Sequence, residues 1–107
     1  MTLPSDPDFL LAPERLAVRV SGQEVILTST QFRLLAVMMA EPGRTFSRTE
    51  LLGRAFDAIV EQRTVDVHVK ELRRKLGPAG ERVQTIRGQG YRYRAVSPAG
   101  QPSQSGS

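Results

Sequence analysis

The chain contains no cysteine, and this absence excludes several kinds of chemistry. Without cysteine there is no disulfide, no thiolate nucleophile and no cysteine ligand for a metal ion. The fold must therefore be stabilised by its apolar core alone. Such a composition suits a reducing compartment, so we expect a cytoplasmic protein.

Long apolar runs are also missing. The longest of them, such as residues 34–40, are far below the roughly 20 residues that span a bilayer. The acidic, proline-containing start does not resemble a signal peptide. We therefore expect neither a membrane contact nor export.

Patterns typical of catalytic and metal sites are scarce. His68 is the only histidine, and one histidine without cysteine cannot form a zinc site. A packed or phosphate-touching imidazole is the simpler role for it. No Ser/His/Asp arrangement, phosphate-binding glycine loop or isolated carboxylate pair stands out. We expect no enzyme, no cofactor and no metal.

The 107 residues are enough for one domain with a single core, and the positive charge is concentrated in its second half. Residues 1–60 hold six Lys and Arg against seven Asp and Glu, a net charge of −1. Residues 61–94 hold nine against four, a net charge of +5. The basic surface is therefore local to the later segment, and an anionic partner is plausible.

Both ends of the chain are poor in residues that can be buried. Residues 1–8 carry prolines and aspartates, and residues 96–107 are rich in Pro, Gly, Ser and Gln. We expect two flexible tails around one domain, residues 9–95.

The domain is predicted to begin with strands and continue with helices. Residues 16–20 and 25–27 read as a hairpin with one buried face, and residues 9–11 as a further edge strand. Thr28 with Gln31, and Ser47 with Glu50, have the spacing of capping boxes, so a helix is predicted to follow each.

A third helix and a second hairpin complete the predicted elements. The helix covers Gln62–Leu76 and ends at Gly77-Pro78. The hairpin joins residues 83–86 and 91–95 through a glycine-containing turn. Alternate tyrosines on its second strand could stack on bases, but core packing is the preferred interpretation.

The third helix is predicted to have two unlike faces. On a helical wheel the core face holds Val65, Val69, Leu72 and Leu76. The opposite face holds Arg63, Val67, Lys70 and Arg74, with Glu71 at its edge. Such a face suits the major groove of DNA, where cations bind phosphates or guanine, and Val contacts thymine methyl groups. An ordinary solvated face, with Glu71 and Lys75 as a simple ion pair, is the alternative.

The second hairpin adds cations beside this face. Arg87 precedes a Gly-x-Gly turn, and Arg92 and Arg94 follow on the return strand. A slender turn can enter a narrow minor groove, where an inserted arginine is favoured. The alternative is a tight turn that only needs glycine for its positive φ.

Four segments carry a resemblance to a known family. Residues 63–76 read RTVDVHVKELRRKL and residues 83–93 read VQTIRGQGYRY. Upstream, LTSTQFRLL at 27–35 and FSRTELL at 46–52 look like signatures of a first and a second helix. Together they resemble the OmpR/PhoB family of response-regulator effector domains, over roughly residues 9–95.

The resemblance implies an α+β fold and a function. The fold would be a winged helix-turn-helix with an N-terminal antiparallel sheet, three helices and a C-terminal β-hairpin wing. The function would be sequence-specific binding of double-stranded DNA as the effector domain of a bacterial two-component transcriptional regulator. Helix 62–76 would enter the major groove and wing 83–95 would lie at the minor groove.

The resemblance also implies ten DNA-contacting residues. We assign phosphate contacts mainly to Arg63, Thr64, His68, Arg73 and Thr85. The candidates for base readout are Val67, Lys70, Glu71 and Arg74, and the candidate for the minor groove is Arg87. Glu71 stands where several relatives carry a base-reading arginine, so the target sequence cannot be taken from them.

Partners follow from the same resemblance. We expect direct-repeat sites on double-stranded DNA, a monomer in solution and a tandem dimer on DNA. Loop 57–62 could contact RNA polymerase, although it is shorter than is usual. Relatives usually carry an N-terminal receiver domain, for which there is no room here, so the sequence is either a part of a longer protein or a stand-alone regulator.

Two other classes of function compete with DNA binding. A winged helix can serve as a protein-interaction platform whose basic face meets an acidic partner. Weak binding to random duplex at low salt distinguishes a DNA reader from such a platform. An enzyme has no motif in its favour.

Overall fold

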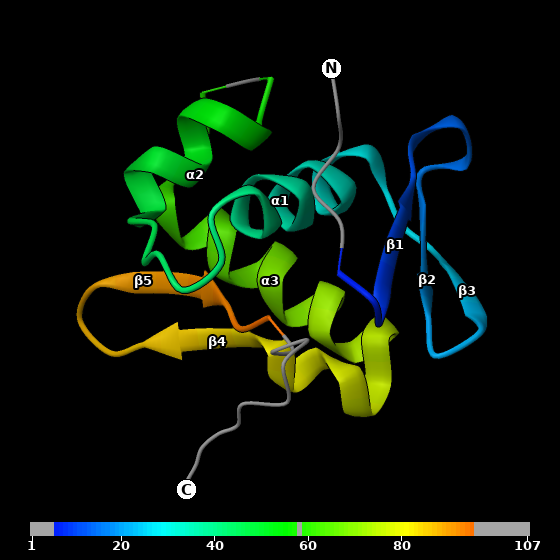
Figure 1. Cartoon of the computed structure of the whole chain (residues 1–107). Coiled ribbons are helices and arrows are strands. Elements are labelled where there is room, and N and C mark those ends of the chain that lie inside the picture. Colours follow the sequence, from blue (N-terminus) through cyan, green and yellow to red (C-terminus); the bar gives the residue numbers. More distant parts are fainter. Residues whose placement is uncertain (1–5, 58, 96–107) are drawn as a thin grey trace, which may run out of the picture.

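The computed structural model describes residues 6–57 and 59–95, and its first layer is a three-stranded antiparallel sheet. β1 (Phe9–Ala12), β2 (Ala17–Val20) and β3 (Gln23–Ile26) lie side by side in that order, at the right of Figure 1. Val18 pairs with Leu11 on one side and Val25 on the other, so apolar residues meet across the three strands. The predicted N-terminal hairpin and edge strand are confirmed, but Leu16 lies outside β2 and is exposed, and the second strand begins at Gln23 rather than at Val25.

Three helices follow, and two of them begin at the predicted capping boxes. α1 (Ser29–Ala40) starts after Thr28, whose hydroxyl accepts from the backbone N–H of Gln31 at 3.1 Å. α2 (Arg48–Ala55) starts after Ser47, with the same exchange between Ser47 and Glu50. These bonds satisfy N–H groups that have no partner inside a helix.

α3 (Gln62–Leu76) has the predicted bounds and the predicted core face. Val65, Val69, Leu72 and Leu76 are all buried, with at most 5% of each residue exposed. They join a core that also contains Phe32, Leu35 and Met38 of α1. The apolar period of the sequence therefore oriented this helix correctly.

The predicted second hairpin is the last element of the described residues. A 3₁₀ segment, η2 (Gly77–Arg82), leads into β4 (Val83–Ile86), which pairs with β5 (Gly90–Tyr93). Tyr91 and Tyr93 of β5 are buried, as their preferred interpretation requires. We call this hairpin the wing.

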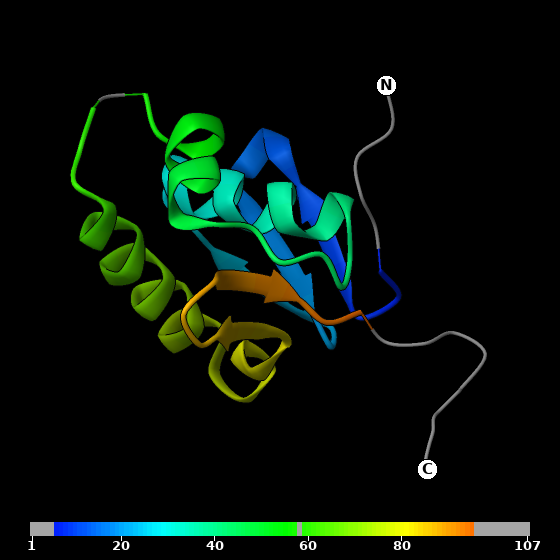
Figure 2. The ribbon, with the colours of Figure 1, turned by 90° about the vertical axis from the view of Figure 1, so that its left-hand side faces the viewer.

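The wing is also paired with the segment before α2. The backbone of Phe46 and that of Tyr91 exchange two N–H···O=C bonds, at 2.8 and 3.0 Å. Gly90 lies so close to this segment that an added Cβ would be 1.9 Å from the carbonyl oxygen of Phe46. Figure 2 shows α3 and the wing turn on one side of the molecule, with the N-terminal sheet behind them.

The described chain begins three residues before the expected domain boundary. Asp6 is buried, its backbone pairs with that of Phe9, and Arg82 lies near the carboxylates of both Asp6 and Asp8. Residues 6–8 are therefore held against the start of β4. The remainder of the two predicted tails lies outside the described residues.

Candidate nucleic-acid interface

The outward face of α3 carries the cations that the wheel predicts. Arg63, Lys70 and Arg74 are exposed, and Val67 is 60% exposed between them. Arg63 is paired with Glu61 at 2.8 Å at the start of the helix. Within the described chain Lys70 has no hydrogen bond or ion pair, so its ammonium group is available to a ligand.

Glu71 is paired on this face, but with a different partner from the one considered. Two guanidinium nitrogens of Arg74 reach the same Glu71 oxygen at 2.7 and 3.0 Å. This hydrogen bond and the charge of Arg74 lower the pKa of Glu71, and the same pair raises the pKa of Arg74. Lys75 instead donates to the amide oxygen of Gln31 at 2.9 Å, bracing the capping box of α1.

His68 packs on the margin of the core. Its ring meets the edge of Phe56 with centroids 5.1 Å apart. Its Nδ1 lies 2.9 Å from the carbonyl oxygen of Thr64, which can only accept, so Nδ1 is the donor in this hydrogen bond. Thr64 and His68 are both half-buried, one turn apart on α3.

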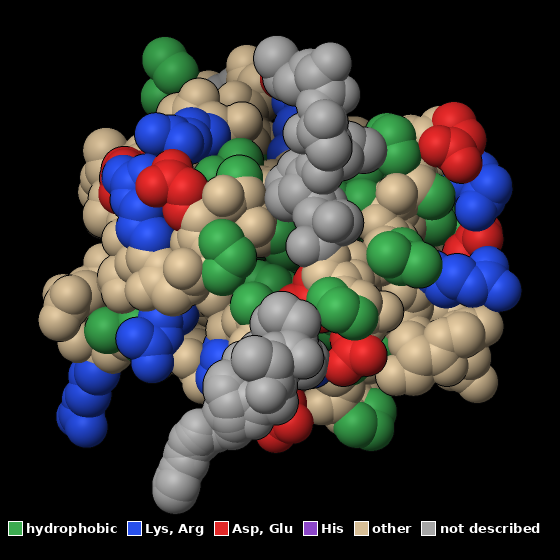
Figure 3. All heavy atoms as spheres, in the orientation of Figure 1, with side chains coloured by type: hydrophobic (Ala, Val, Ile, Leu, Met, Phe, Trp, Pro, Cys, Tyr) green, Lys and Arg blue, Asp and Glu red, His purple; other side chains and the backbone are tan. Residues whose placement is uncertain are grey.

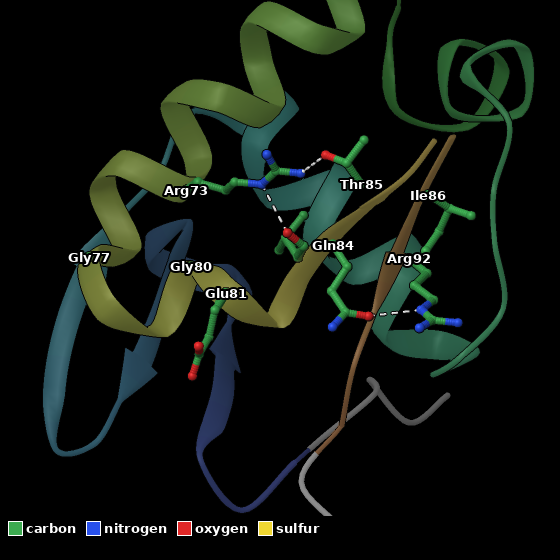
Figure 4. Close-up of a pocket in the computed structure, with 9 residues that line it drawn as sticks. Arg73, Gly77, Gly80, Glu81, Gln84, Thr85, Ile86 and Arg92 are labelled. Atoms are coloured by element: carbon green, nitrogen blue, oxygen red, sulfur yellow. Dashed lines mark hydrogen bonds between the residues drawn. The ribbon is translucent and has the colours of Figure 1, made fainter. Parts of the chain in front are cut away.

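Arg73 and Thr85 are hydrogen-bonded to each other in the free domain, although Thr85 remains exposed. The Arg73 guanidinium donates to the carbonyl oxygen of Val83 at 2.9 Å and to the Thr85 hydroxyl. Figure 4 shows both bonds crossing from α3 to β4, at one side of a groove of about 630 Å³. The sequence predicts phosphate contacts for both residues, and in the free domain they bind each other.

The outer surface of the wing is basic. Arg87 lies exposed at the turn, beside Gly88, whose φ is +76°. Arg92, on the outer face of β5, donates to Gln84 of β4 at 2.8 Å. Lys and Arg side chains surround the wing turn at the lower left of Figure 3, and one of them projects beyond the rest.

A polar cluster that sequence reasoning missed joins α2, α3 and the wing. One oxygen of Asp66 accepts from the Tyr91 hydroxyl at 2.5 Å and from Arg48 at 2.7 Å. Burial alone would raise the pKa of Asp66, but these hydrogen bonds and the charge of Arg48 outweigh it and lower the pKa. The only sequence signal was a carboxylate between the core face and the cationic face of α3.

The connection between α2 and α3 forms an apolar hollow. Leu52, Phe56, Ile59 and Val60 line a pocket of about 290 Å³, together with Gly53 and Asp57. Ile59 is fully exposed at its edge.

In the two described ranges no helix is long and apolar enough to cross a bilayer. Nor do residues 6–57 and 59–95 contain a cluster of three or more His, Cys, Asp or Glu that could hold a metal ion.

A family model and curated relatives match this chain. The family described as "Transcriptional regulatory protein, C terminal" matches residues 22–93. The phosphate regulon transcriptional regulatory protein PhoB of Pseudomonas aeruginosa is 40% identical over 92 residues, covering 83% of this chain and 40% of PhoB. The transcriptional regulatory protein CseB of Streptomyces avermitilis is 45% identical over 84 residues, covering 77% of this chain and 35% of CseB. The chain thus spans about two fifths of these relatives.

Solved structures share the fold. The DNA-binding domain of the response regulator AdeR, solved with an intercistronic region, superposes with a TM-score of 0.77 at 28% identity, covering 85% of this chain and 98% of that one. The DNA-binding domain of CpxR from E. coli gives a TM-score of 0.75 at 27% identity, covering 91% and 100%. Three helices between an N-terminal sheet and a terminal hairpin are common to this group of winged-helix domains.

Proposed function

Since this chain belongs to the transcriptional regulatory protein C-terminal family, the DNA-binding effector domains of response regulators, we propose that it binds specific duplex sequences through two of its elements. α3 enters the major groove and the wing lies at the minor groove. The observation that carries this proposal is the division of α3 into a buried apolar face and an outward cationic face beside a basic turn. The same family membership argues against catalysis.

Base readout belongs to the middle of the outward face of α3. Lys70 and Arg74 can donate to the acceptors of guanine, and Glu71 can accept from the amino group of cytosine. Val67 supplies an apolar contact for a thymine methyl group. Because Arg74 and Glu71 hold each other in the free domain, they present a donor and an acceptor side by side.

Phosphate contacts fix the helix in the groove. Arg63 and Thr64 lie at the start of α3, where backbone N–H groups also favour an anion. His68, Arg73 and Thr85 belong to the same proposed set. Arg87 at the wing turn is the proposed minor-groove residue, because a narrow minor groove concentrates negative potential.

The complete regulator is a wider proposal. We infer a two-component transcriptional regulator that acts in the cytoplasm on direct-repeat sites, with this domain monomeric alone and a tandem dimer on DNA. RNA polymerase is a second proposed partner, through loop 57–62. The exposed Ile59 beside an apolar pocket of about 290 Å³ supports a protein contact there.

Selection from a random duplex library tests the proposal directly. The domain should enrich one motif, bind it at least about 10³-fold more tightly than random duplex, and lose affinity steeply with added salt. Binding to no duplex even at low salt would contradict DNA recognition and favour an acidic protein partner. Enrichment of single half-sites without a repeat would overturn the tandem-dimer part alone.

A further inference from the structure

We propose that Asp66 is a positioning residue that, together with Arg73, fixes the wing against α3, so that the major and minor grooves are read at a set separation. The inference rests on the proposed function and deepens it. It assigns to Asp66 a role in specificity without a contact to DNA.

Asp66 and Arg73 form one stripe along α3 that faces the wing. They are seven residues apart, which is close to two helical turns and about 10 Å along the axis. Asp66 bonds to Tyr91 of β5, and Arg73 bonds to Val83 and Thr85 of β4. The helix therefore holds each strand of the wing at a different height, and such a two-point attachment resists rotation.

Tyr91 is the common partner of this attachment. Its hydroxyl donates to Asp66, and the guanidinium carbons of Arg48 and Arg73 lie 5.4 and 5.5 Å from its ring centroid. Its backbone is paired with Phe46 on the other side. Moving the wing relative to α3 would break these contacts together, so the hairpin has one preferred angle.

Asp66 is a poor candidate for touching DNA itself. It is ionised at neutral pH, because its pKa is lowered, and a carboxylate near phosphates weakens binding. Its oxygen Oδ1 already accepts two hydrogen bonds within the domain. Electrostatics alone thus predicts that neutralising Asp66 strengthens binding to every duplex, whereas positioning predicts a selective loss on the specific site.

We expect the affinity for the specific site to be lost through the wing, because Arg87 lies beyond the last contact between the wing and α3. The turn that carries Arg87 follows directly after β4, so the angle of the hairpin decides where its guanidinium arrives. A hairpin free to rotate would spread Arg87 over several positions. Binding would then require an ordering cost that the intact domain avoids.

The decisive experiment compares Asp66→Ala with Asp66→Asn on the site selected by the wild-type domain and on random duplex. Both variants remove one negative charge, but only asparagine keeps an acceptor for the Tyr91 hydroxyl. We expect Asp66→Ala to lower the ratio of specific to random affinity by about tenfold, which corresponds to about 1.4 kcal/mol. Asp66→Asn should recover much of that ratio.

A double-mutant cycle assigns the loss to the wing. Arg87→Ala should cost much less specific affinity in the Asp66→Ala background than in the wild type. Tyr91→Phe removes only the hydroxyl and should lower the ratio of specific to random affinity as Asp66→Ala does. It is the second variant to use if urea denaturation shows that Asp66→Ala is too unstable to be folded in the binding assay. Unchanged ratios in Asp66→Ala and Tyr91→Phe would overturn the inference, whereas a wild-type domain that selects no site would overturn the proposed function instead.

Discussion

The arginines from α3 to the wing differ in what their guanidinium groups still offer to a ligand. Arg73 donates to Val83 and Thr85 of the wing, and Arg74 is paired with Glu71 while staying exposed. Arg87 has no hydrogen bond or ion pair within residues 6–57 and 59–95. The surroundings of each arginine therefore decide what it can offer to DNA, and each can be tested by a single substitution.

Arg74→Ala tests base readout. Removing a guanidinium that contacts guanine should cost about 1–3 kcal/mol of specific binding free energy. Binding to random duplex should fall much less, since only one of several cations is lost. Gel-shift titration of both duplexes measures the two effects, and the exposed Arg19 in the N-terminal sheet provides the matched control variant Arg19→Ala. Equal losses on the two duplexes would remove Arg74 from base readout.

Gly90→Ala tests how closely the wing approaches the segment before α2. A Cβ there would lie 1.9 Å from the Phe46 carbonyl oxygen, so the backbone must shift. We expect a loss of about 3 kcal/mol in the free energy of unfolding, measured in urea. Gly53→Ala is the control, because nothing lies within 4 Å of its added Cβ and alanine favours the α2 helix. Gly53→Ala should stabilise the domain by about 0.5–1 kcal/mol. A Gly90→Ala domain as stable as the wild type would show that the wing does not lie tightly against the segment before α2.

At the scale of the elements, the side chains next to its first residue determine where α1 begins. α1 depends on the exchange between Thr28 and Gln31, and Lys75 of α3 braces the same Gln31 oxygen. The start of α1 is thereby connected to the last turn of α3. Loss of the Thr28–Gln31 cap should therefore destabilise both the start of α1 and the last turn of α3.

Thr28→Ala removes this cap. We expect the free energy of unfolding to fall by about 1 kcal/mol, because an N–H of the first turn loses its acceptor. Ser29→Ala, one residue later and inside the helix, should change it by only a few tenths. Urea denaturation of the two variants makes the comparison, and equal effects would mean that the hydroxyl of Thr28 does not cap α1.

Acidification should weaken the attachment between α3 and the wing. The pKa of Asp66 is lowered in the folded domain, so its contribution to stability is present above the ordinary value of about 3.9 and is lost as pH falls through the folded value. Wild-type stability should therefore decline more steeply between about pH 5 and pH 3 than that of Asp66→Asn. Urea titrations across this range measure both slopes. Parallel slopes would mean that Asp66 titrates alike in the folded and unfolded chains.

The elements were predictable from the sequence, but their mutual contacts were not. Capping boxes and the apolar period are local, so the bounds of α3 and the starts of α1 and α2 came from neighbouring residues. The Asp66–Tyr91 bond joins residues that are 25 positions apart, and no periodicity indicates which strand packs on the margin of a helix. The pairing of Arg82 with Asp6 and Asp8 was missed for the same reason.

At the scale of the whole molecule, the excess positive charge lies on the side formed by α3 and the wing. The net charge of +5 in residues 61–94 belongs to α3 and the wing, which lie together on one side of the molecule (Figure 2). The N-terminal sheet lies away from this side. Arg15, between β1 and β2, is paired with Glu14 and Glu24, which leaves Arg19 of β2 as an exposed cation of the sheet. A polyanion would therefore approach in one orientation.

Salt dependence tests this polarity. Arg63→Gln should weaken specific and random duplex alike and reduce the slope of log K against log salt concentration by about one, the value for one phosphate contact. Arg19→Gln, in the N-terminal sheet, should leave the slope unchanged. DNA titrations at several salt concentrations measure both slopes. An equal change of slope in the two variants would show that only the total charge of the domain matters, and not where the charge lies.

β5 is the last element of the described chain, yet Tyr93 is among the largest of its fully buried side chains. Its carbonyl oxygen accepts from Gly43, and Tyr91 pairs with Phe46, so the strand closes against residues more than 40 positions earlier. During synthesis on the ribosome the core stays open until this strand has emerged. Completion of the fold is therefore a late event, and a chain released early would expose the apolar surface of α1 on which β5 packs.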